Sequence, residues 1–123
     1  VRSSAASDVY KRQNDNMEII KERCSGNLKT EQLSGVTEMN ILTIPPNSSI
    51  SCMANLWDVL LNLSSNTAYV FIAGRTYEII NDSSSYATII CMSSSTVRCD
   101  YYQLSKLLFE CGFLALQDDV VIK

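Results

Sequence analysis

Five cysteines and a complete lack of histidine decide which chemistry is open to this 123-residue chain. The cysteines are Cys24, Cys52, Cys91, Cys99 and Cys111, and no two of them have the Cys-x-x-Cys spacing of zinc sites or thiol oxidoreductases. A nucleophilic cysteine or serine normally needs a neighbouring base such as histidine. We therefore expect reduced, mostly buried thiols, and we expect no metal centre, no cofactor and no enzymatic activity.

Two charged motifs are further candidates for binding. Asp118 and Asp119 form an adjacent carboxylate pair that could bind a cation, but adjacent side chains diverge in a strand, so a turn is the favoured interpretation. Arg75 follows Gly74 and could contact an anion or a protein partner. A solvated arginine at a turn is the common alternative.

The net charge of −3 argues against a nucleic-acid interface. Four aromatic residues could stack on bases, but they lack basic neighbours, so packing in the core or in an interface is favoured: Tyr69, Phe71, Tyr77 and Tyr86. No apolar run approaches the roughly 20 residues of a membrane-spanning helix. The N-terminus also lacks the apolar segment of a signal peptide, and we expect a cytoplasmic protein without nucleic-acid or membrane partners.

The hydrophobic pattern predicts a central helix followed by a tight hairpin. The helix would begin at a Ser48 or Ser49 cap and end at residues 64–66. Its apolar stripe has the spacing of an amphipathic helix: Ile50, Met53, Ala54, Trp57, Leu60 and Leu61. The apolar run 68–72 is typical of a strand, Gly74 permits the turn, and residues 76–80 would return as the second strand.

Shorter elements lie on both sides of this centre. Residues 39–44 indicate a strand that ends before two prolines. Residues 86–92 favour a strand by propensity and a short helix by spacing, and residues 96–99 favour a short strand. Asp100 would cap a second helix with an apolar face reaching Cys111, with Gly112 just beyond its end. The apolar runs 113–116 and 120–122 could form an edge strand or a small hairpin.

A chain of this length is expected to form one domain. Residues 1–13 resemble a translated sequencing adapter of the kind found on environmental-DNA sequences, and we expect a disordered tail there. Residues 14–37 would form a helical N-terminal extension, and residues 38–123 a single α+β domain. The expected architecture is an open-faced sandwich, in which an antiparallel sheet carries two or three helices on one face.

The expected order of elements resembles that of the histidine-containing phosphocarrier (HPr) family. The matching positions are Ser49-Ile50 at the start of the first helix, Ala73-Gly74-Arg75 at the hairpin turn, and residues 85–90, where the family has a short serine-led helix. The resemblance implies a phosphoryl-accepting histidine near the start of the first helix, stabilised by an arginine.

This chain departs from the phosphocarrier pattern at the acceptor. Residues 47–53 contain Ser49, Ser51 and Cys52, which could contact an anion or a partner, but neither histidine nor arginine. The resemblance therefore implies a module that has lost its phosphoacceptor. It also places Ser85 at the family's second, serine modification site, although capping of the short helix is the favoured role for Ser85.

The leading functional expectation is a non-catalytic regulatory or binding module with a protein partner. The first alternative is a small ligand-sequestering or enzyme-inhibiting protein, of a kind that phages and mobile elements encode, which acts through the hairpin and a homo-oligomer interface. A carboxylate-dependent hydrolase or transferase is the second alternative. It has the least support, because no paired acid and base can be placed.

Overall fold

The computed structural model describes residue 36 and residues 38–123, so the predictions for residues 1–13 and for the extension before residue 36 lie outside the described range. The elements within this range are β1 (Glu38–Ile44), β2 (Ser48–Met53), β3 (Trp57–Asn62), β4 (Thr67–Ile72), β5 (Thr76–Asn81), β6 (Ala87–Ser94), α3 (Tyr101–Glu110), β7 (Leu114–Leu116) and β8 (Val120–Ile122). A large sheet has the strand order β1-β6-β3-β4-β7, and a small sheet has the order β2-β5-β8.

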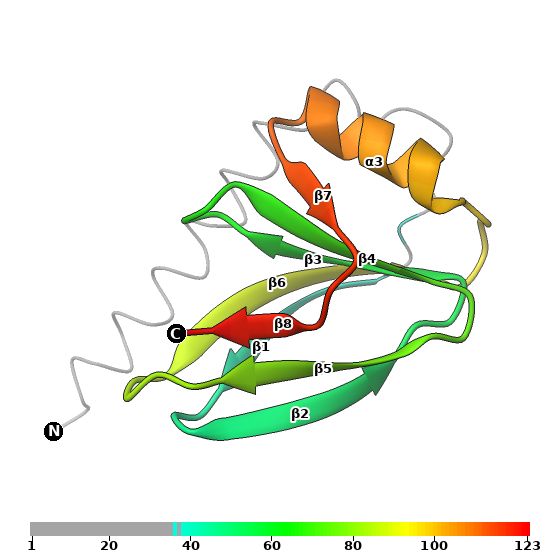
Figure 1. The fold of residues 1–123 in the computed structure, drawn as a ribbon. Coiled ribbons are helices and arrows are strands. Elements are labelled where there is room, and N and C mark those ends of the chain that lie inside the picture. The colour runs from blue at the N-terminus through cyan, green and yellow to red at the C-terminus, as the bar shows by residue number, and fades with distance from the viewer. Residues whose placement is uncertain (1–35, 37) are drawn as a thin grey trace, which may run out of the picture.

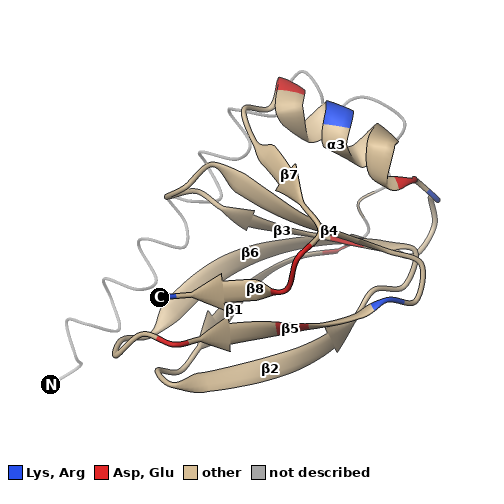
Figure 2. Cartoon of the chain, in the orientation of Figure 1, with Lys and Arg blue, Asp and Glu red and all other residues tan. Residues whose placement is uncertain are grey.

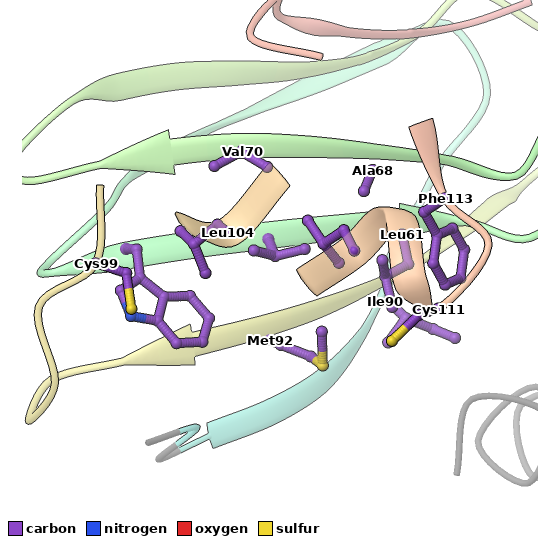
Figure 3. Close-up of a cluster of buried hydrophobic side chains, with 12 residues drawn as sticks. Leu61, Ala68, Val70, Ile90, Met92, Cys99, Leu104, Cys111 and Phe113 are labelled. Atoms are coloured by element: carbon purple, nitrogen blue, oxygen red, sulfur yellow. The ribbon is translucent and has the colours of Figure 1, made fainter. Parts of the chain in front are cut away.

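The large sheet is the middle layer of the molecule. Helix α3 covers one of its faces and the small sheet lies against the other (Figure 1). Figure 3 shows the cluster beneath α3, which includes Leu104 of the helix and Val70 and Met92 of the sheet. A second cluster fills the space between the sheets and includes Leu60, Phe71 and Ile79. Burial of these two apolar layers is the main force that holds the elements together.

The predicted helix from the Ser48 or Ser49 cap to residues 64–66 is wrong, because this stretch forms β2 and β3, in different sheets, and the turn after β3. In β2, Ile50 and Cys52 are partly buried, whereas the alternate serines are exposed. In β3, Trp57 packs beneath α3 and Leu60 packs between the sheets. The strand therefore has apolar residues on both faces and lacks the alternation of apolar and polar residues that marks a half-buried strand. When the two strands are treated as one segment, their apolar residues have the spacing of an amphipathic helix, which explains the wrong prediction.

The expected α+β open-faced sandwich is therefore also wrong. The described residues contain two β-sheets and one helix, rather than one antiparallel sheet with two or three helices. The strand pairing is not purely antiparallel either, since β7 lies parallel to β4 and β8 lies parallel to β5. Within the same residues, no helix has the length and apolar character needed to cross a membrane.

Both strands of the predicted hairpin exist, but they do not pair with each other. Strand β4 pairs with β3 and β7 in the large sheet, while β5 pairs with β2 and β8 in the small sheet. Gly74 lies between them with a φ of 77°, and its N–H donates to the Ala54 carbonyl at 2.9 Å. The positive φ was expected, but it turns the chain from one sheet to the other. The actual hairpin joins β3 to β4, with Asn66 at a φ of 54° in its turn.

The flanking predictions have mixed outcomes. The first strand is confirmed as β1, and residues 86–92 lie within or just before strand β6, so the helical alternative is wrong. Residues 96–99 are a loop and not a strand. This loop is held by the Val97 carbonyl, which accepts a 2.9 Å hydrogen bond from Nε1 of buried Trp57. Its position thus depends on a contact distant in sequence.

The last part of the chain follows its local signals closely. The Gln103 N–H donates to Asp100 Oδ1 at 2.8 Å, and the Asp100 N–H donates to Gln103 Oε1 at 2.9 Å, which completes a capping box at the start of α3. Gly112 follows the helix with a φ of 87°. The last two apolar runs become β7 and β8, one at an edge of each sheet, so the edge-strand alternative is correct and the hairpin alternative is wrong.

Candidate functional site

A cavity of about 320 Å³, with both polar and apolar side chains in its lining, opens between the two sheets, near the end of β2 and the start of β3. Both sheets contribute to its walls. Its main chemical groups come from Glu38, Asn40, Cys52, Asp58, Tyr77 and Cys91. The residues at its base are buried, whereas Glu38 and Asn40 at its mouth are exposed.

The strand register of the large sheet determines which side chains share this cavity. Ser93 of β6 is paired with Glu38 of β1 on one side and with Asp58 of β3 on the other. The two carboxylates therefore lie in one row across three strands, and all three side chains line the cavity. On the facing small sheet, Cys52 is paired with Tyr77. A row of polar groups thus faces a phenol and a thiol.

Tyr77 and Asp58 form the base of the cavity. The Tyr77 hydroxyl donates to Asp58 Oδ2 at 2.6 Å, and both residues are buried, with exposed fractions of 3% and 7%. The Tyr77 ring stacks on Phe71 with a centroid distance of 3.9 Å and an interplanar angle of 4°. Because Phe71 is the strand partner of Asp58, this stacking aims the phenol at the carboxylate.

Asp58 retains one carboxylate oxygen for the cavity. Tyr77 is its only side-chain hydrogen-bond partner among the described residues, and that bond uses Oδ2. In the same part of the chain, no fully buried side-chain oxygen or nitrogen lacks a hydrogen-bond partner. Oδ1 must therefore reach accessible space, and the space that Asp58 lines is the cavity.

Burial dominates the ionisation of this group of side chains. It raises the pKa of Asp58, an effect that the Tyr77 hydrogen bond opposes and the nearby charge of Glu38 reinforces. Burial, followed by the bond to Asp58, raises the pKa of Tyr77 far above its ordinary value. The phenol is therefore a permanent hydrogen-bond donor near neutral pH.

The two thiols of the cavity are also held in their protonated form. Burial, assisted by the charge of Asp58, raises the pKa of Cys91 to about 12. Burial likewise raises the pKa of Cys52, while a hydrogen bond with Tyr77 acts in the opposite direction. Since the thiolate is the nucleophilic form of cysteine, neither residue is an activated nucleophile. Within the described part of the chain, Cys52, Cys91 and Cys99 are free thiols.

Of the residues proposed from the sequence for contact with an anion or a partner, the structure brings only Cys52 to the cavity. Ser49 and Ser51 are exposed on the other face of β2. Arg75 lies 5.1 Å from the centroid of the Phe71 ring and does not line the cavity. These four residues therefore do not form a common anion site.

Ser85 lies in the connection between β5 and β6, where no helix follows it for the serine to cap. Its carbonyl accepts hydrogen bonds from Asn81 Nδ2 at 2.9 Å and from Ser83 Oγ at 2.9 Å. The two adjacent aspartates lie in the connection between β7 and β8, where Asp119 Oδ1 accepts from the Glu78 N–H at 3.3 Å. The pair thus lies in a connection with a bend at Asp118 and not within a strand.

The sequence did not single out Glu38 or Asp58, Cys91 was expected only to be a buried thiol, and Tyr77 was favoured for packing in the core or in an interface. One signal was available, because Asp58 is the sole charged residue in the apolar run from Leu56 to Leu61. A lone carboxylate within a buried run usually has a specific partner. The partner itself was not visible, since Tyr77 belongs to the other sheet.

No described group of three or more histidine, cysteine, aspartate or glutamate side chains could hold a metal ion. The element order that suggested a phosphocarrier is also not observed, because β2 and β3 replace the expected first helix. No protein-family model, curated protein or solved structure significantly matches this chain.

Proposed function

We propose that this protein is a non-catalytic binding module that holds a small polar ligand in the cavity between its two sheets. The observation that carries the proposal is the buried pair of Asp58 and Tyr77 at the base of that cavity. The volume of about 320 Å³ is at the lower end of the roughly 300 to 1,000 Å³ that is typical of small-molecule sites. The ligand is therefore small.

The chemistry of the lining favours binding over catalysis. A carboxylate with a raised pKa could act as a general base, but it would need a nucleophile or a second titrating group close to the same ligand atom. The thiols of Cys52 and Cys91 and the phenol of Tyr77 keep their protons near neutral pH. They are suited to hydrogen bonding and to shape recognition instead.

This proposal retains the binding role expected from the sequence and the ligand-sequestering alternative, but it moves the site. The sequence placed the ligand at a hairpin and an oligomer interface, whereas the cavity is formed within one chain. A protein partner and a homo-oligomer remain predictions. Light scattering coupled to size-exclusion chromatography, with and without bound ligand, would test both.

The direct test is a fragment screen by NMR with the full ¹⁵N-labelled chain. The library would contain neutral, cationic and anionic molecules of up to about eight non-hydrogen atoms, in keeping with the small volume. We expect saturable chemical-shift changes at the amides of Cys52, Asp58, Tyr77 and Cys91. The proposal is wrong if no fragment of any charge produces such changes at these residues.

A matched pair of variants distinguishes the cavity from other surfaces. Asn40→Trp places a large side chain at the exposed mouth of the cavity, whereas Ser49→Trp places the same side chain on the outer face of β2. We expect Asn40→Trp to abolish the shift changes and Ser49→Trp to leave them intact. Equal binding by both variants would contradict the assignment of the site.

A further inference from the structure

We infer that the ligand of this cavity is a small protonated amine, held between the carboxylates of Glu38 and Asp58. This inference rests on the proposed binding function and specifies the class of ligand. It follows from the arrangement of charge in the cavity, from the unused carboxylate oxygen of Asp58, and from the volume available.

Two carboxylates face the same cavity from the large sheet. Glu38 and Asp58 lie in one row on the large sheet, with Ser93 between them, so two strand spacings of about 4.8 Å each separate their backbones. The Glu38 carboxylate is held at the mouth by the Asn40 side chain, whose Nδ2 donates to Oε1 at 2.9 Å. A cation between the two carboxylates would interact with both.

The two carboxylates of the cavity have no positively charged side chain beside them among the described residues. None of the described lysines or arginines lines the cavity. Figure 2 shows them apart from one another, on α3, in loops and at the C-terminus. Asp58 is 93% buried and yet has no cationic partner among the described residues, which is costly for a carboxylate. Its Oδ1 atom faces the cavity, where a cationic ligand would supply the missing charge.

The side chains of the cavity suit an organic cation better than a metal ion. The described residues offer no cluster of side chains that could hold a metal ion, whereas ionised carboxylates accept hydrogen bonds and therefore favour a cation that carries N–H donors. A primary ammonium group carries three N–H donors and can bind Asp58 Oδ1 and Glu38 together. The walls beside these groups include Leu42 and Met53, which suit a short hydrocarbon chain. These features match an alkylamine better than an inorganic ion.

The ionisation of the cavity supports this assignment. Burial raises the pKa of Asp58, so the carboxylate has more to gain from a cation than an exposed one would. The other titratable groups that face it are Glu38, Cys52, Tyr77 and Cys91. The phenol and the thiols keep their protons near neutral pH, so they contribute no competing change of charge.

The test compares four probes of similar length by calorimetry and NMR with the full chain at neutral pH. Butylamine and 1,4-diaminobutane are the cations, 1,4-butanediol is the neutral analogue and succinate is the anion. We expect both amines to bind in the cavity, the diol to bind at least tenfold more weakly, and succinate to give no cavity shifts. We also expect the affinity for the amines to fall as the pH is lowered towards protonation of Asp58.

Two charge-neutralising variants separate a specific ion pair from the general field of an acidic protein. Asp58→Asn should weaken amine binding at least tenfold and diol binding by a much smaller factor. Asp118→Asn removes the same charge from an exposed connection and should change neither. Since Asp58→Asn could impair folding, Glu38→Gln, at an exposed position, is measured in parallel and should weaken amine binding several-fold.

The outcomes distinguish this inference from the proposed function. If the diol or succinate binds in the cavity as tightly as butylamine, the ligand class is wrong, while the binding function stands. The same conclusion follows if Asp58→Asn and Glu38→Gln both bind butylamine as the wild type does. If no probe of any charge and no fragment occupies the cavity, the binding function fails and this inference fails with it.

Discussion

Tyr77 of β5 donates a 2.6 Å hydrogen bond to Asp58 of β3 and thereby joins the small sheet to the large sheet. The bond lies at the base of the cavity, and both residues are almost completely buried. A hydrogen bond to a charged group in such a place is stronger than its solvent-exposed equivalent. One pair of residues therefore serves both the cohesion of the sheets and the chemistry of the candidate site.

Removal of the Tyr77 hydroxyl should destabilise the fold. In Tyr77→Phe the buried Asp58 carboxylate loses its donor, and we expect the free energy of unfolding to fall by about 1 to 3 kcal/mol. Urea denaturation would measure the change. Tyr86→Phe is the control, since Tyr86 is 67% exposed, and it should change stability by less than about 0.5 kcal/mol. Similar effects for the two variants would show that the Tyr77 bond contributes nothing specific.

The buried carboxylate should also affect how stability depends on pH. Burial raises the pKa of Asp58 in the folded state, so between the unfolded value of about 3.9 and the raised value the folded state binds more protons. The stability that protonated Asp58 contributes at low pH is therefore lost as the pH rises through this window. Above the window, Asp58 causes no further change of stability with pH. Asp58→Asn does not titrate, so its stability relative to the wild type should increase over the window.

Denaturation of both proteins at a series of pH values would measure this change. Asp118→Asn serves as the control for the loss of one negative charge at an exposed position. A constant difference between Asp58→Asn and the wild type across the series would contradict the prediction, because the folded and unfolded pKa of Asp58 would then be equal.

Asn81 should be among the most sensitive polar positions of the protein. It is completely buried, its Nδ2 donates to three carbonyls, and its Oδ1 accepts from the N–H and the hydroxyl of Ser83. The three acceptors are the carbonyls of Ile44, Pro45 and Ser85. Asn81→Ala removes the buried bond to the Ile44 carbonyl and the partly buried bonds to Pro45, Ser83 and Ser85 together, and we expect stability to fall by about 2 to 4 kcal/mol.

Urea denaturation would test the Asn81 prediction against Asn62→Ala. The Asn62 side chain accepts from the N–H groups of Ser64 and Ser65 in the partly exposed turn between β3 and β4. Water can replace these bonds, so the loss for Asn62→Ala should be about 1 kcal/mol or less. The interpretation of Asn81 as a buried hub is wrong if the two losses are equal.

The cap of α3 offers a test that depends on one oxygen atom. Asp100→Ala removes the acceptor of the Gln103 N–H and should lower stability by about 1 kcal/mol. Asp100→Asn keeps a side-chain oxygen at the same place and should lose much less. Circular dichroism during denaturation would compare the two variants, and equal losses would indicate that the charge, rather than the cap, is responsible.

The thiols should differ in reactivity according to their burial. Burial raises the pKa of Cys91 to about 12, so this thiol should resist iodoacetamide in the folded protein at mildly alkaline pH. Cys52, which is only partly buried at the cavity wall, should react faster, and butylamine should slow its reaction. Peptide mass spectrometry after timed labelling would measure both rates. Fast labelling of Cys91 in the native protein would contradict the burial of this wall.

The parts of the fold that could be predicted are those with a complete local signal. The helix from Tyr101 was predictable because Asp100 caps its start, its apolar residues keep a helical period, and Gly112 follows its end. The strands β1, β4 and β5 were predictable from β-branched and aromatic runs bounded by proline, glycine and polar residues. In each case the residues that decide the conformation lie within a few positions of one another.

The stretch from Ser48 to Asn62 shows why other parts could not be predicted. Strand β3 is covered by α3 on one face and by the small sheet on the other, so its apolar run has no period to reveal a strand. The candidate site was hidden for a related reason. Asp58 is noticeable as a lone carboxylate, but Tyr77, Glu38 and Cys91 reach it from three other strands.

The sequence by itself therefore determined the helix at residues 101–110, the strand segments β1, β4 and β5, and the absence of imidazole chemistry. Only the tertiary structure decided which strands are neighbours, that β4 and β5 belong to different sheets, and that a phenol meets a buried carboxylate between them. The physical reason is that side-chain patterns report how deeply a segment is buried. The backbone hydrogen bonds that pair strands are the same for every sequence, so the choice of partner depends on how the whole chain packs.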